Sequence, residues 1–445
     1  MSQTHPRKGE LGQPGNKGQF GARSNSSPAV SLSFPSADVA DVPVPMLPPE
    51  RKRWVPDAHS MLPQAQILRQ TGTYESFVPA RITDWSPKIP NELATDVEEA
   101  TIALREFDAH AAQRLGASIT ELGPMSAILL RTESAHSSQI EQLTTSARQL
   151  ALEELDESGK KNSNLVMRNV RAMEAAVALS EDLSVDTILG MHRKLLEDDH
   201  LLSEEAGRFR QELVWVGGED AGPIGAALVA PQSERVPEAV SDVVAFMNRR
   251  NIPTLTKLAI AHAQFENIHP FVDGNGRTGR AIAHSLLRKD GLTTAVTVPL
   301  SAGLLRNTER YFDALTAYRN GDAAPIIRSV TNAARFASVS GTELVDNLAA
   351  QLDESRSKLA GVRSSSKAWT ILPGLIGQPV INAKYVRKKF GFNEMTTQRA
   401  LATLTKRGVL RERTGHSRNR VWGHEGILNV LDAYAAGIKR VKPGK

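Results

Sequence analysis

The chain has 445 residues, of which 40% are hydrophobic and 23% are charged, and its formal net charge at pH 7 is +5. It contains no cysteine, which excludes disulfides, thiolate nucleophiles and zinc–thiolate sites and fits a reducing cytoplasm. No apolar run approaches the roughly 20 residues that span a membrane, and the polar start lacks the apolar centre of a signal peptide. We therefore expect a cytoplasmic protein of two or three domains without a membrane partner.

The first part of the chain divides into a tail and a helical region. Residues 1–60 are rich in Pro, Ser and Gly and show little periodicity, which predicts a disordered tail. Over 61–164 apolar residues recur at helical spacing, as at Val97 and Leu104, and this pattern predicts an N-terminal helical extension. The polar stretch 153–164 predicts a loop between helices.

Two short runs of β-forming residues follow, at 214–216 and 227–230, with glycines between them. Alternating β-formers around glycines predict a β-hairpin. Pro237 then stands at the first position of a helix, where a proline is well tolerated.

The centre of the chain predicts two helices joined by a glycine-rich turn. Helical spacing of apolar residues continues to about Asn267, and Pro270 ends that helix because it lacks an N–H group. The next helix begins near Asn275. Gly274 and Gly276 therefore lie at a helix N-terminus, where free N–H groups and the helix dipole favour an anion.

The same turn carries the residue types that nucleotidyl or phosphoryl transfer needs. His269 can act as a base, Asp273 can bind a cation, and Arg277 and Arg280 can clamp phosphates from one helix face. Asp273 could equally cap the helix, and the sequence does not separate these roles. The glycines over 274–279 also match a dinucleotide-binding fingerprint, but that fingerprint requires a preceding strand, and a helix precedes it here. A zinc protease would need His-Glu-x-x-His, which is absent.

The C-terminal part is basic. From residue 361 onward there are 17 Lys and Arg against 4 Asp and Glu, a net +13, which leaves −8 for the first 360 residues. We expect a connecting helix over 341–365, a winged helix-turn-helix domain over 366–437 and a basic tail over 438–445. The winged domain is expected to contain a helix near Trp369, a helix over 383–390, a third helix capped by Asn393, and two strands around a tip at 415–416.

The charge of this domain predicts a DNA or RNA contact, and a protein-binding or dimerisation role remains an equal alternative. In a DNA complex, the residues expected to face bases are Thr396, Thr397, Gln398 and Arg399. Those expected to meet phosphates are Lys406, Arg413, Arg418 and Arg420.

The segment 269–280, His-Pro-Phe-Val-Asp-Gly-Asn-Gly-Arg-Thr-Gly-Arg, resembles the Fic-family signature His-x-Phe-x-(Asp/Glu)-Gly-Asn-Gly-Arg-x-x-Arg position for position. The resemblance extends over roughly 75–340. It implies a mainly α Fic fold with a β-hairpin flap and a catalytic domain over 165–340. It also implies a protein adenylyltransferase, which uses ATP and Mg²⁺ to transfer AMP to a Ser, Thr or Tyr hydroxyl of a target protein. Family habit suggests a homodimer.

The resemblance also assigns roles to single residues. His269 would be the general base, Asp273 would hold Mg²⁺, and Arg280 would meet the γ-phosphate. The residues implied to bind the nucleotide are Phe271, Val272, Asp273, Gly274, Asn275, Gly276, Arg277 and Arg280. Because both motif glycines are kept, the segment resembles the AMP-transferring majority rather than phosphate- or phosphocholine-transferring variants. Tyr311 and Phe312 resemble an aromatic pair near the adenine, although core aromatics would look the same.

Two further stretches resemble parts of the family. Ser137 and Glu141 match its inhibitory motif, (Ser/Thr)-x-x-x-Glu-(Gly/Asn), which implies that Glu141 pairs with Arg280 in the space of the γ-phosphate. Gln142 replaces the usual Gly or Asn, which leaves the local helix ending open. The flap that would hold the target backbone is carried by Val214, Trp215, Leu228 and Val229.

Two other functions remain open. The chain could be a DNA-binding regulator whose Fic domain senses a nucleotide, or a bifunctional enzyme that also removes AMP with Glu141 activating water.

Overall fold

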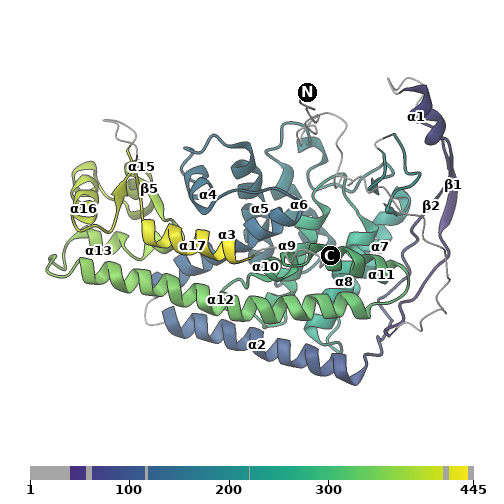
Figure 1. Cartoon of the computed structure of the whole chain (residues 1–445), viewed down its shortest axis with the longest axis horizontal. Coiled ribbons are helices and arrows are strands. Elements are labelled where there is room, and N and C mark those ends of the chain that lie inside the picture. Colours follow the sequence, from purple (N-terminus) through teal and green to yellow (C-terminus); the bar gives the residue numbers. More distant parts are fainter. Residues whose placement is uncertain (1–40, 57–62, 116–118, 220, 414–419, 439–445) are drawn as a thin grey trace, which may run out of the picture.

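Helices make up most of the fold, because apolar residues recur at helical spacing along most of the chain. A computed structural model describes residues 41–56, 63–115, 119–219, 221–413 and 420–438, and Figure 1 shows their arrangement. The α-helices in chain order are α1 (Gln64–Arg69), α2 (Asn91–Leu115), α3 (Ile119–Ile140), α4 (Ala147–Glu153), α5 (Lys161–Ala178), α6 (Val185–Leu196), α7 (Val236–Met247), α8 (Thr254–Ile268), α9 (Asn275–Lys289), α10 (Leu300–Leu305), α11 (Thr308–Arg319), α12 (Ala324–Lys358), α13 (Lys367–Ile371), α14 (Gly374–Gly377), α15 (Ala383–Phe390), α16 (Glu394–Lys406) and α17 (Glu425–Gly437). The strands are β1 (Glu50–Trp54), β2 (Gly72–Ser76), β3 (Trp215–Val216), β4 (Leu228–Val229), β5 (Val380–Asn382), β6 (Arg411–Glu412) and β7 (Val421–Gly423).

The helices α8 and α9 pack together at the centre of the helical body. α8 is buried on nearly every side, since α7, α11 and α12 also contact it. Apolar side chains of both helices, among them Leu258, Phe265 and Leu287, belong to one large hydrophobic core. The helix expected up to about Asn267 and the helix expected from near Asn275 are therefore both confirmed, with the glycine-rich turn between them.

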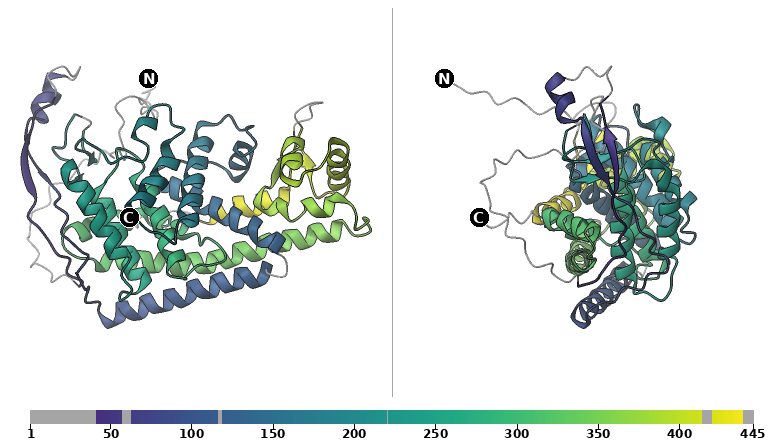
Figure 2. Two further views of the ribbon diagram at one scale, coloured as in Figure 1. Left: turned by 180° about the vertical axis from the view of Figure 1, so that it is seen from behind. Right: turned by 90° about the vertical axis from the view of Figure 1, so that its right-hand side faces the viewer.

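Two long helices, α2 and α12, run side by side along one face of this body (Figures 1 and 2). They approach so closely that a Cβ added at Gly341 would lie 2.8 Å from a ring carbon of Phe107. The connecting helix expected over 341–365 is only the last part of α12, which begins at Ala324, so the expected division at 340/341 falls inside one helix. No proline interrupts the sequence from 326 to 358, and neighbouring helices bury one side of α12 along its length.

The last part of the chain forms a small module at the opposite end from β1 and β2 (Figure 1). Its three strands make an antiparallel sheet in the order β5-β7-β6. The expected helices near Trp369 and over 383–390 are confirmed, as is the cap of the third helix, where the Asn393 side chain accepts the N–H of Thr396. The helices α14 and α17 were not anticipated. The tip, Arg418 and the tail beyond Ile438 lie outside the described residues.

The surface of this module differs from the expected DNA-binding face in one residue. Thr397 is fully buried, so its side chain cannot reach a base, and that expectation is wrong. Arg413 pairs with Glu425 and Arg420 pairs with Glu412, so two of the expected phosphate contacts already have a carboxylate partner. Thr397 lies three and four positions before Ala400 and Leu401, on the stripe of α16 that faces the module's core, and its side chain is buried for that reason.

The sequence-based expectation of a disordered tail over 1–60 fails for residues 41–56. Residues 41–56 are ordered: Pro43 pairs with Asp322, and β1 pairs antiparallel with β2. The prediction of disorder is therefore wrong for 41–56, while residues 1–40 lie outside the described residues. The segments that pair with 41–56 are β2 and the region of Asp322, and neither is a neighbour in the sequence. Local sequence patterns therefore do not predict this pairing. The loop expected over 153–164 is also shorter, since α5 begins at Lys161.

No helix in the part of the chain that the structure describes is both long enough and apolar enough to span a membrane.

The close contact of α2 and α12 gives a stability prediction. Gly341→Val should lower the free energy of unfolding by about 1–3 kcal/mol, because the new side chain must displace the Phe107 ring from a filled interface. Chemical denaturation measures this change. Gly190→Ala in α6 is the control, because its Cβ enters open space and should stabilise the helix by about 1 kcal/mol. If Gly341→Val had the same free energy of unfolding as the parent, the argument from close packing of α2 and α12 would be contradicted.

Candidate active site

The turn after α8 places His269 at the end of that helix in a left-handed conformation, with φ 50° and ψ 61°. Its N–H still donates to the Phe265 carbonyl at 3.0 Å, and Pro270 prevents the helix from continuing. A left-handed backbone at a non-glycine residue costs about 1–2 kcal/mol, so other contacts must hold it.

Arg210 supplies those contacts. Its side chain is buried, and its Nε donates to the His269 carbonyl at 2.8 Å. The two remaining guanidinium nitrogens donate to the carbonyls of Glu212 and Pro231, both at 2.7 Å. Arg210 thereby ties the turn to the two limbs of the β3–β4 hairpin. Burial lowers its pKa to about 10, which leaves it charged at neutral pH. The sequence carries no local signal for this role, because an arginine that precedes a hairpin is usually exposed.

The hydrogen bonds of His269 define its chemistry. Its Nδ1 lies 3.2 Å from the Glu266 carbonyl, which can only accept, so Nδ1 carries the proton and Nε2 has a free lone pair. Burial lowers the pKa of His269 to about 4, against the opposing effect of the Glu266 carbonyl. The imidazole is therefore neutral at pH 7 and able to accept a proton through Nε2.

His192 and Asn275 shape the turn from either side. The ring of His192 stacks on Phe271, with centroids 3.7 Å apart and planes 4° apart. The N–H of Gly207 donates to Nδ1 of His192, so Nε2 carries the proton and donates to the Asp273 carbonyl at 3.0 Å. The Asn275 side chain accepts from the N–H of Phe271 at 2.9 Å and donates to its carbonyl at 2.8 Å. His192 was also missed, because it lies 77 positions before His269 on a different helix.

The start of α9 has the geometry of an anion site. The Thr278 N–H donates to the Gly274 carbonyl, so the N–H groups of Asn275, Gly276 and Arg277 belong to the first turn, where helical acceptors are lacking. Gly274 has φ +80°, and a Cβ there would meet Leu195 at 2.6 Å. Both the backbone conformation and the lack of space therefore oppose any side chain at this position.

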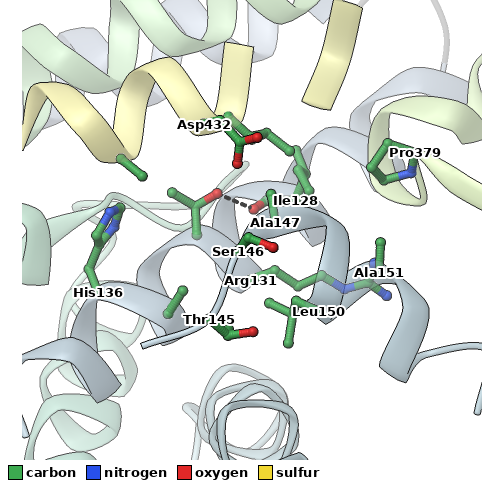
Figure 3. Close-up of a pocket in the computed structure, with 14 residues that line it drawn as sticks. Ile128, Arg131, His136, Thr145, Ser146, Ala147, Leu150, Ala151, Pro379 and Asp432 are labelled. Carbon is green, nitrogen blue, oxygen red and sulfur yellow. Dashed lines mark hydrogen bonds between the residues drawn. The ribbon is translucent and has the colours of Figure 1, made fainter. Parts of the chain in front are cut away.

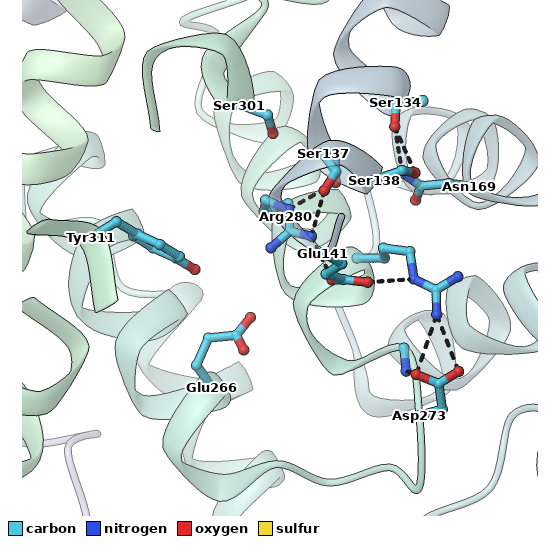
Figure 4. Close-up of polar contacts among 12 residues, drawn as sticks. Ser134, Ser137, Ser138, Glu141, Asn169, Glu266, Asp273, Arg280, Ser301 and Tyr311 are labelled. Carbon is cyan, nitrogen blue, oxygen red and sulfur yellow. Dashed lines mark hydrogen bonds and ion pairs between the residues drawn. The ribbon is translucent and has the colours of Figure 1, made fainter. Parts of the chain in front are cut away.

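A carboxylate from α3 lies over this first turn (Figure 4). Glu141 Oε1 is 2.6 Å from the Arg280 guanidinium, and Oε2 is 2.9 Å from Nε of Arg277, whose N–H is not aligned for a hydrogen bond. A Cβ at Gly276 would lie 2.5 Å from Glu141 Oε1. The expected pair of Glu141 with Arg280 is thus present, and the contact with Arg277 is additional. Arg277 also pairs with Asp273 at 3.3 Å.

Ser137 and the end of α3 hold the carboxylate in place. Arg280 donates through Nε to the Ser137 hydroxyl at 2.8 Å and through a terminal nitrogen to its carbonyl at 2.9 Å. Gln142 adopts φ 66°, its N–H donates to the Gln139 carbonyl, and the Leu143 N–H donates to Ser138. The helix therefore ends as it would with Gly or Asn, so Gln142 does not disturb the ending.

Behind the guanidinium of Arg280 lies a buried group of titratable side chains (Figure 4). The Tyr311 hydroxyl is 2.7 Å from Nε2 of His262, and the Glu266 carboxylate is 3.9 Å from the same nitrogen. Burial raises the pKa of Glu266 to about 7, and Arg280 opposes this rise. Tyr311 is a core side chain whose hydroxyl has a protein partner, whereas Phe312 is half-buried. The adenine contact expected for these two aromatics stays a prediction.

The β3–β4 hairpin confirms the predicted strands, with Trp215 opposite Val229. Val214, Leu228 and Val229 are buried, and Trp215 is half-buried. The Phe77 N–H donates to the Val229 carbonyl at 2.9 Å, so one edge of the hairpin is already paired.

Side chains of the N-terminal segment, residues 50–77, also hydrogen-bond to the loop between β3 and β4. The Gln70 side chain donates to the Ile224 carbonyl at 3.0 Å and accepts its N–H at 3.1 Å. The Trp54 indole N–H donates to the Ala221 carbonyl, and its ring meets Trp215 edge to face at 5.5 Å. The sequence carries no signal for these contacts, because the partners lie more than 100 positions apart.

Val272, at the middle of the turn, is buried.

Among the described residues there is no group of three or more His, Cys, Asp or Glu that could hold a metal. Asp273 is the carboxylate of the turn between α8 and α9, and a single carboxylate is compatible with Mg²⁺, which typically binds through one or two carboxylates together with substrate phosphates.

Comparisons with known proteins agree with the site. Residues 182–287 match the family model described as Fic/DOC family, so this segment is a Fic domain and the resemblance expected from the sequence is confirmed. The chain is 30% identical over 167 residues to the protein adenylyltransferase Fic of Drosophila melanogaster and 28% identical to that of Drosophila ananassae. Each alignment covers 37% of this chain and 30% of the relative, so the chain matches less than a third of those proteins.

Two solved structures also resemble the chain. A Fic family protein from Desulfovibrio desulfuricans G20 is 22% identical, with a TM-score of 0.47, and the match covers 76% of this chain and 97% of that one. Fic-1 (aa134–508) from C. elegans is 24% identical, with a TM-score of 0.43, and the match covers 57% of this chain and 73% of that one.

The left-handed residue after α3 gives a second prediction. Gln142→Gly should raise the free energy of unfolding by about 0.5–1 kcal/mol, because glycine adopts φ 66° without a Cβ clash. Thermal or chemical unfolding of the full chain measures the change. Gln142→Ala is the control, since it removes the amide but keeps the strain and should give no gain. Equal stability of all three chains would contradict this account of the helix ending.

Proposed function

We propose that the chain is a protein adenylyltransferase that transfers AMP from ATP to a Ser, Thr or Tyr hydroxyl of a target protein, and that Glu141 restrains it. The observation that carries the proposal is the neutral imidazole of His269 beside a helix N-terminus that is built for an anion. The names of the curated relatives, protein adenylyltransferase Fic, support this activity.

The residues divide the chemistry in a simple way. The target hydroxyl oxygen bonds to the α-phosphorus of ATP, its proton moves to Nε2 of His269, and the bond to pyrophosphate breaks. The first-turn N–H groups of α9 and the guanidiniums of Arg277 and Arg280 would hold the phosphate oxygens. Asp273 would bind Mg²⁺, which neutralises phosphate charge when present. Positioned general-base catalysis typically contributes about 10²–10⁴-fold.

The restraint follows from competition for the same cations. Glu141 lies against both guanidiniums and above Gly276, so a triphosphate that used them would have to displace it. Two anions close together in a buried site repel each other. In the bifunctional alternative, Glu141 would activate a water molecule that removes AMP, and its present position beside Arg277 and Arg280 is compatible with that role too.

The hairpin supports a role in docking the target backbone. A target segment could add to a hairpin edge by main-chain pairing, which reads little sequence. The Val229 carbonyl on β4 is paired with Phe77, so the edge proposed for the target is that of β3. A cytoplasmic location and a homodimer remain proposals that rest on composition and on the family resemblance.

The activity is tested by incubating the full chain with α-labelled ATP and Mg²⁺. Glu141→Gly should label itself or an added protein at least tenfold faster than the parent, because the arginines become free for phosphate. Adding His269→Ala to that chain should reduce labelling by about 10²–10⁴-fold. Exposed Glu157→Gly is the matched control and should behave as the parent. Absence of labelling in Glu141→Gly would overturn the proposed activity, and equal labelling of parent and Glu141→Gly would overturn the restraint.

We further propose that the C-terminal module is a winged helix-turn-helix that contacts DNA. Its order of strands and helices supports this, as does the net +13 of the residues from 361 onward. Of the residues expected to contact DNA, Thr396 is partly exposed, and the exposed ones are Gln398, Arg399, Lys406, Arg413 and Arg420.

Retention of the full chain by a random DNA duplex should fall steeply between about 50 and 200 mM salt if several phosphates are contacted. Replacing exposed Lys406 and Arg407 by alanine should weaken retention and flatten the salt dependence. No retention at low salt would instead favour a protein-binding or dimerisation role for the module.

A further inference from the structure

Two features of the helical body take no part in the proposed transfer. One is a cavity of about 70 Å³ whose walls come mainly from α3, α4 and α17 (Figure 3). Its lining includes both Arg131 and Asp432 among apolar side chains, so it favours no single class of ligand. The other is the carboxyl group of Glu266 on α8, which lies with Tyr311 behind the Arg280 guanidinium (Figure 4).

The carboxyl group of Glu266 is buried with few polar contacts. Its side chain is 11% exposed, and among the described residues Oε1 has no hydrogen-bond partner. Nε2 of His262 is 3.9 Å away and is only 2.7 Å from the Tyr311 hydroxyl. A Cβ at Gly279 would lie 2.6 Å from Oε1, so the carboxyl group packs directly against the backbone of α9. An ionised carboxylate in such a place is unfavourable unless a cation compensates it.

The titratable groups that face Glu266 come from four helices. Arg280 on α9 is the cation among them, and Glu141 on α3 is a second carboxylate. His262 lies on α8 itself, and burial lowers its pKa to about 3, so its ring is neutral at pH 7. Tyr311 on α11 stays protonated, because burial raises its pKa above the usual value. Burial raises the pKa of Glu266 to about 7, Arg280 opposes this rise, and Glu141 adds to it.

Arg280 thus has two carboxyl neighbours. Glu141 is in contact with its guanidinium at 2.6 Å, and Glu266 attracts the same charge without a hydrogen bond. A triphosphate that displaced Glu141 would bring more negative charge to Arg280 than the one carboxylate that leaves, even with Mg²⁺ bound. An ionised Glu266 would repel that triphosphate, whereas a protonated Glu266 would not.

We propose that Glu266 is a positioning residue of the nucleotide site, and that its carboxyl group takes up a proton from solvent when a triphosphate occupies Arg277 and Arg280. This inference rests on the proposed function. The proton comes from the buffer and bonds to a carboxylate oxygen of Glu266, and no other bond is made or broken. Glu266 acts through the charge of Arg280 and not on the reacting atoms.

The sign of the pH dependence follows from linkage. A bound triphosphate raises the pKa of Glu266, so the complex keeps a proton at a pH at which the free chain has lost it. Affinity is then greatest below the pKa of the free chain and falls as the pH rises toward the pKa of the complex. Because Glu266 titrates near pH 7, the fall should lie between pH 6.0 and 8.5. The histidines His192 and His269 do not contribute there, since burial lowers the pKa of each to about 4.

The test measures binding of α,β-methylene-ATP with Mg²⁺ to the full chain carrying Glu141→Gly, by isothermal titration calorimetry. This analogue is not cleaved between its α- and β-phosphates, and Glu141→Gly removes the competing carboxylate. We expect binding at least threefold weaker at pH 8.5 than at pH 6.0. At pH 7.5 we expect proton uptake, seen as a binding enthalpy that differs between HEPES and Tris buffers in proportion to their ionisation enthalpies.

Two further substitutions in the Glu141→Gly chain assign the proton. Adding Glu266→Gln should remove both the pH dependence and the proton uptake, because an amide does not titrate in this range. Adding Glu238→Gln on α7 is the matched control, since Glu238 is exposed, and it should keep both effects.

The outcomes separate this inference from the proposed function. Nucleotide binding to Glu141→Gly with equal affinity at both pH values and no proton uptake overturns the role of Glu266 and leaves the proposed function standing. A full pH dependence in the Glu266→Gln chain does the same. If that chain does not fold, proton uptake by Glu141→Gly decides, because it needs no change at Glu266. Absence of nucleotide binding at every pH overturns the proposed function, and the role of Glu266 with it.

Discussion

The structure depends on which anion neutralises the two buried guanidinium groups of Arg277 and Arg280. The side chains of Arg277 and Arg280 are only 5% and 4% exposed, and both project from the first turns of a helix, whose N-terminus is itself positive. Such an arrangement is unfavourable unless an anion is present. In this structure that anion is Glu141. Burial alone would lower the pKa of Arg280, but the attraction of nearby groups, chiefly Glu141, is larger and raises the pKa above its usual value. A ligand that displaces Glu141 must therefore itself be anionic to keep these guanidiniums paired.

This requirement explains why so much of the fold surrounds α3. The carboxylate of Glu141 can satisfy the arginines only if α3 ends at Ile140 and is held at the correct depth. Ser137 fixes the end near the arginines, and Asn169 on α5 donates to Ser134 and Ser138 one turn away. The C-terminal module binds the other face through Arg131. The position of one carboxylate thus depends on the contacts of α3 with α9, with α5 and with the C-terminal module.

The positions of His269 and of the β3–β4 hairpin depend on a second constraint, which is the buried side chain of Arg210. Its guanidinium donates to the carbonyls of His269, Glu212 and Pro231, so these hydrogen bonds join the turn after α8 to the hairpin. The N-terminal segment also binds the hairpin, since Gln70 pairs with Ile224 as a neighbouring strand would. A peptide bound along β3 would then be placed at a set distance from the imidazole.

The sequence alone determined the local elements and the residue types that the turn presents. Proline and glycine positions act through neighbouring backbone, so the break at Pro270, the start of α9 at Asn275 and the hairpin strands could be predicted. The partners of those elements were decided by the tertiary structure. Arg210, His192 and the β1–β2 hairpin acquire their roles from residues tens to hundreds of positions away, and burial of a single side chain such as Thr397 depends on which neighbour covers it. Periodicity carries no information about such distant contacts, because it records which face is apolar and not what that face meets.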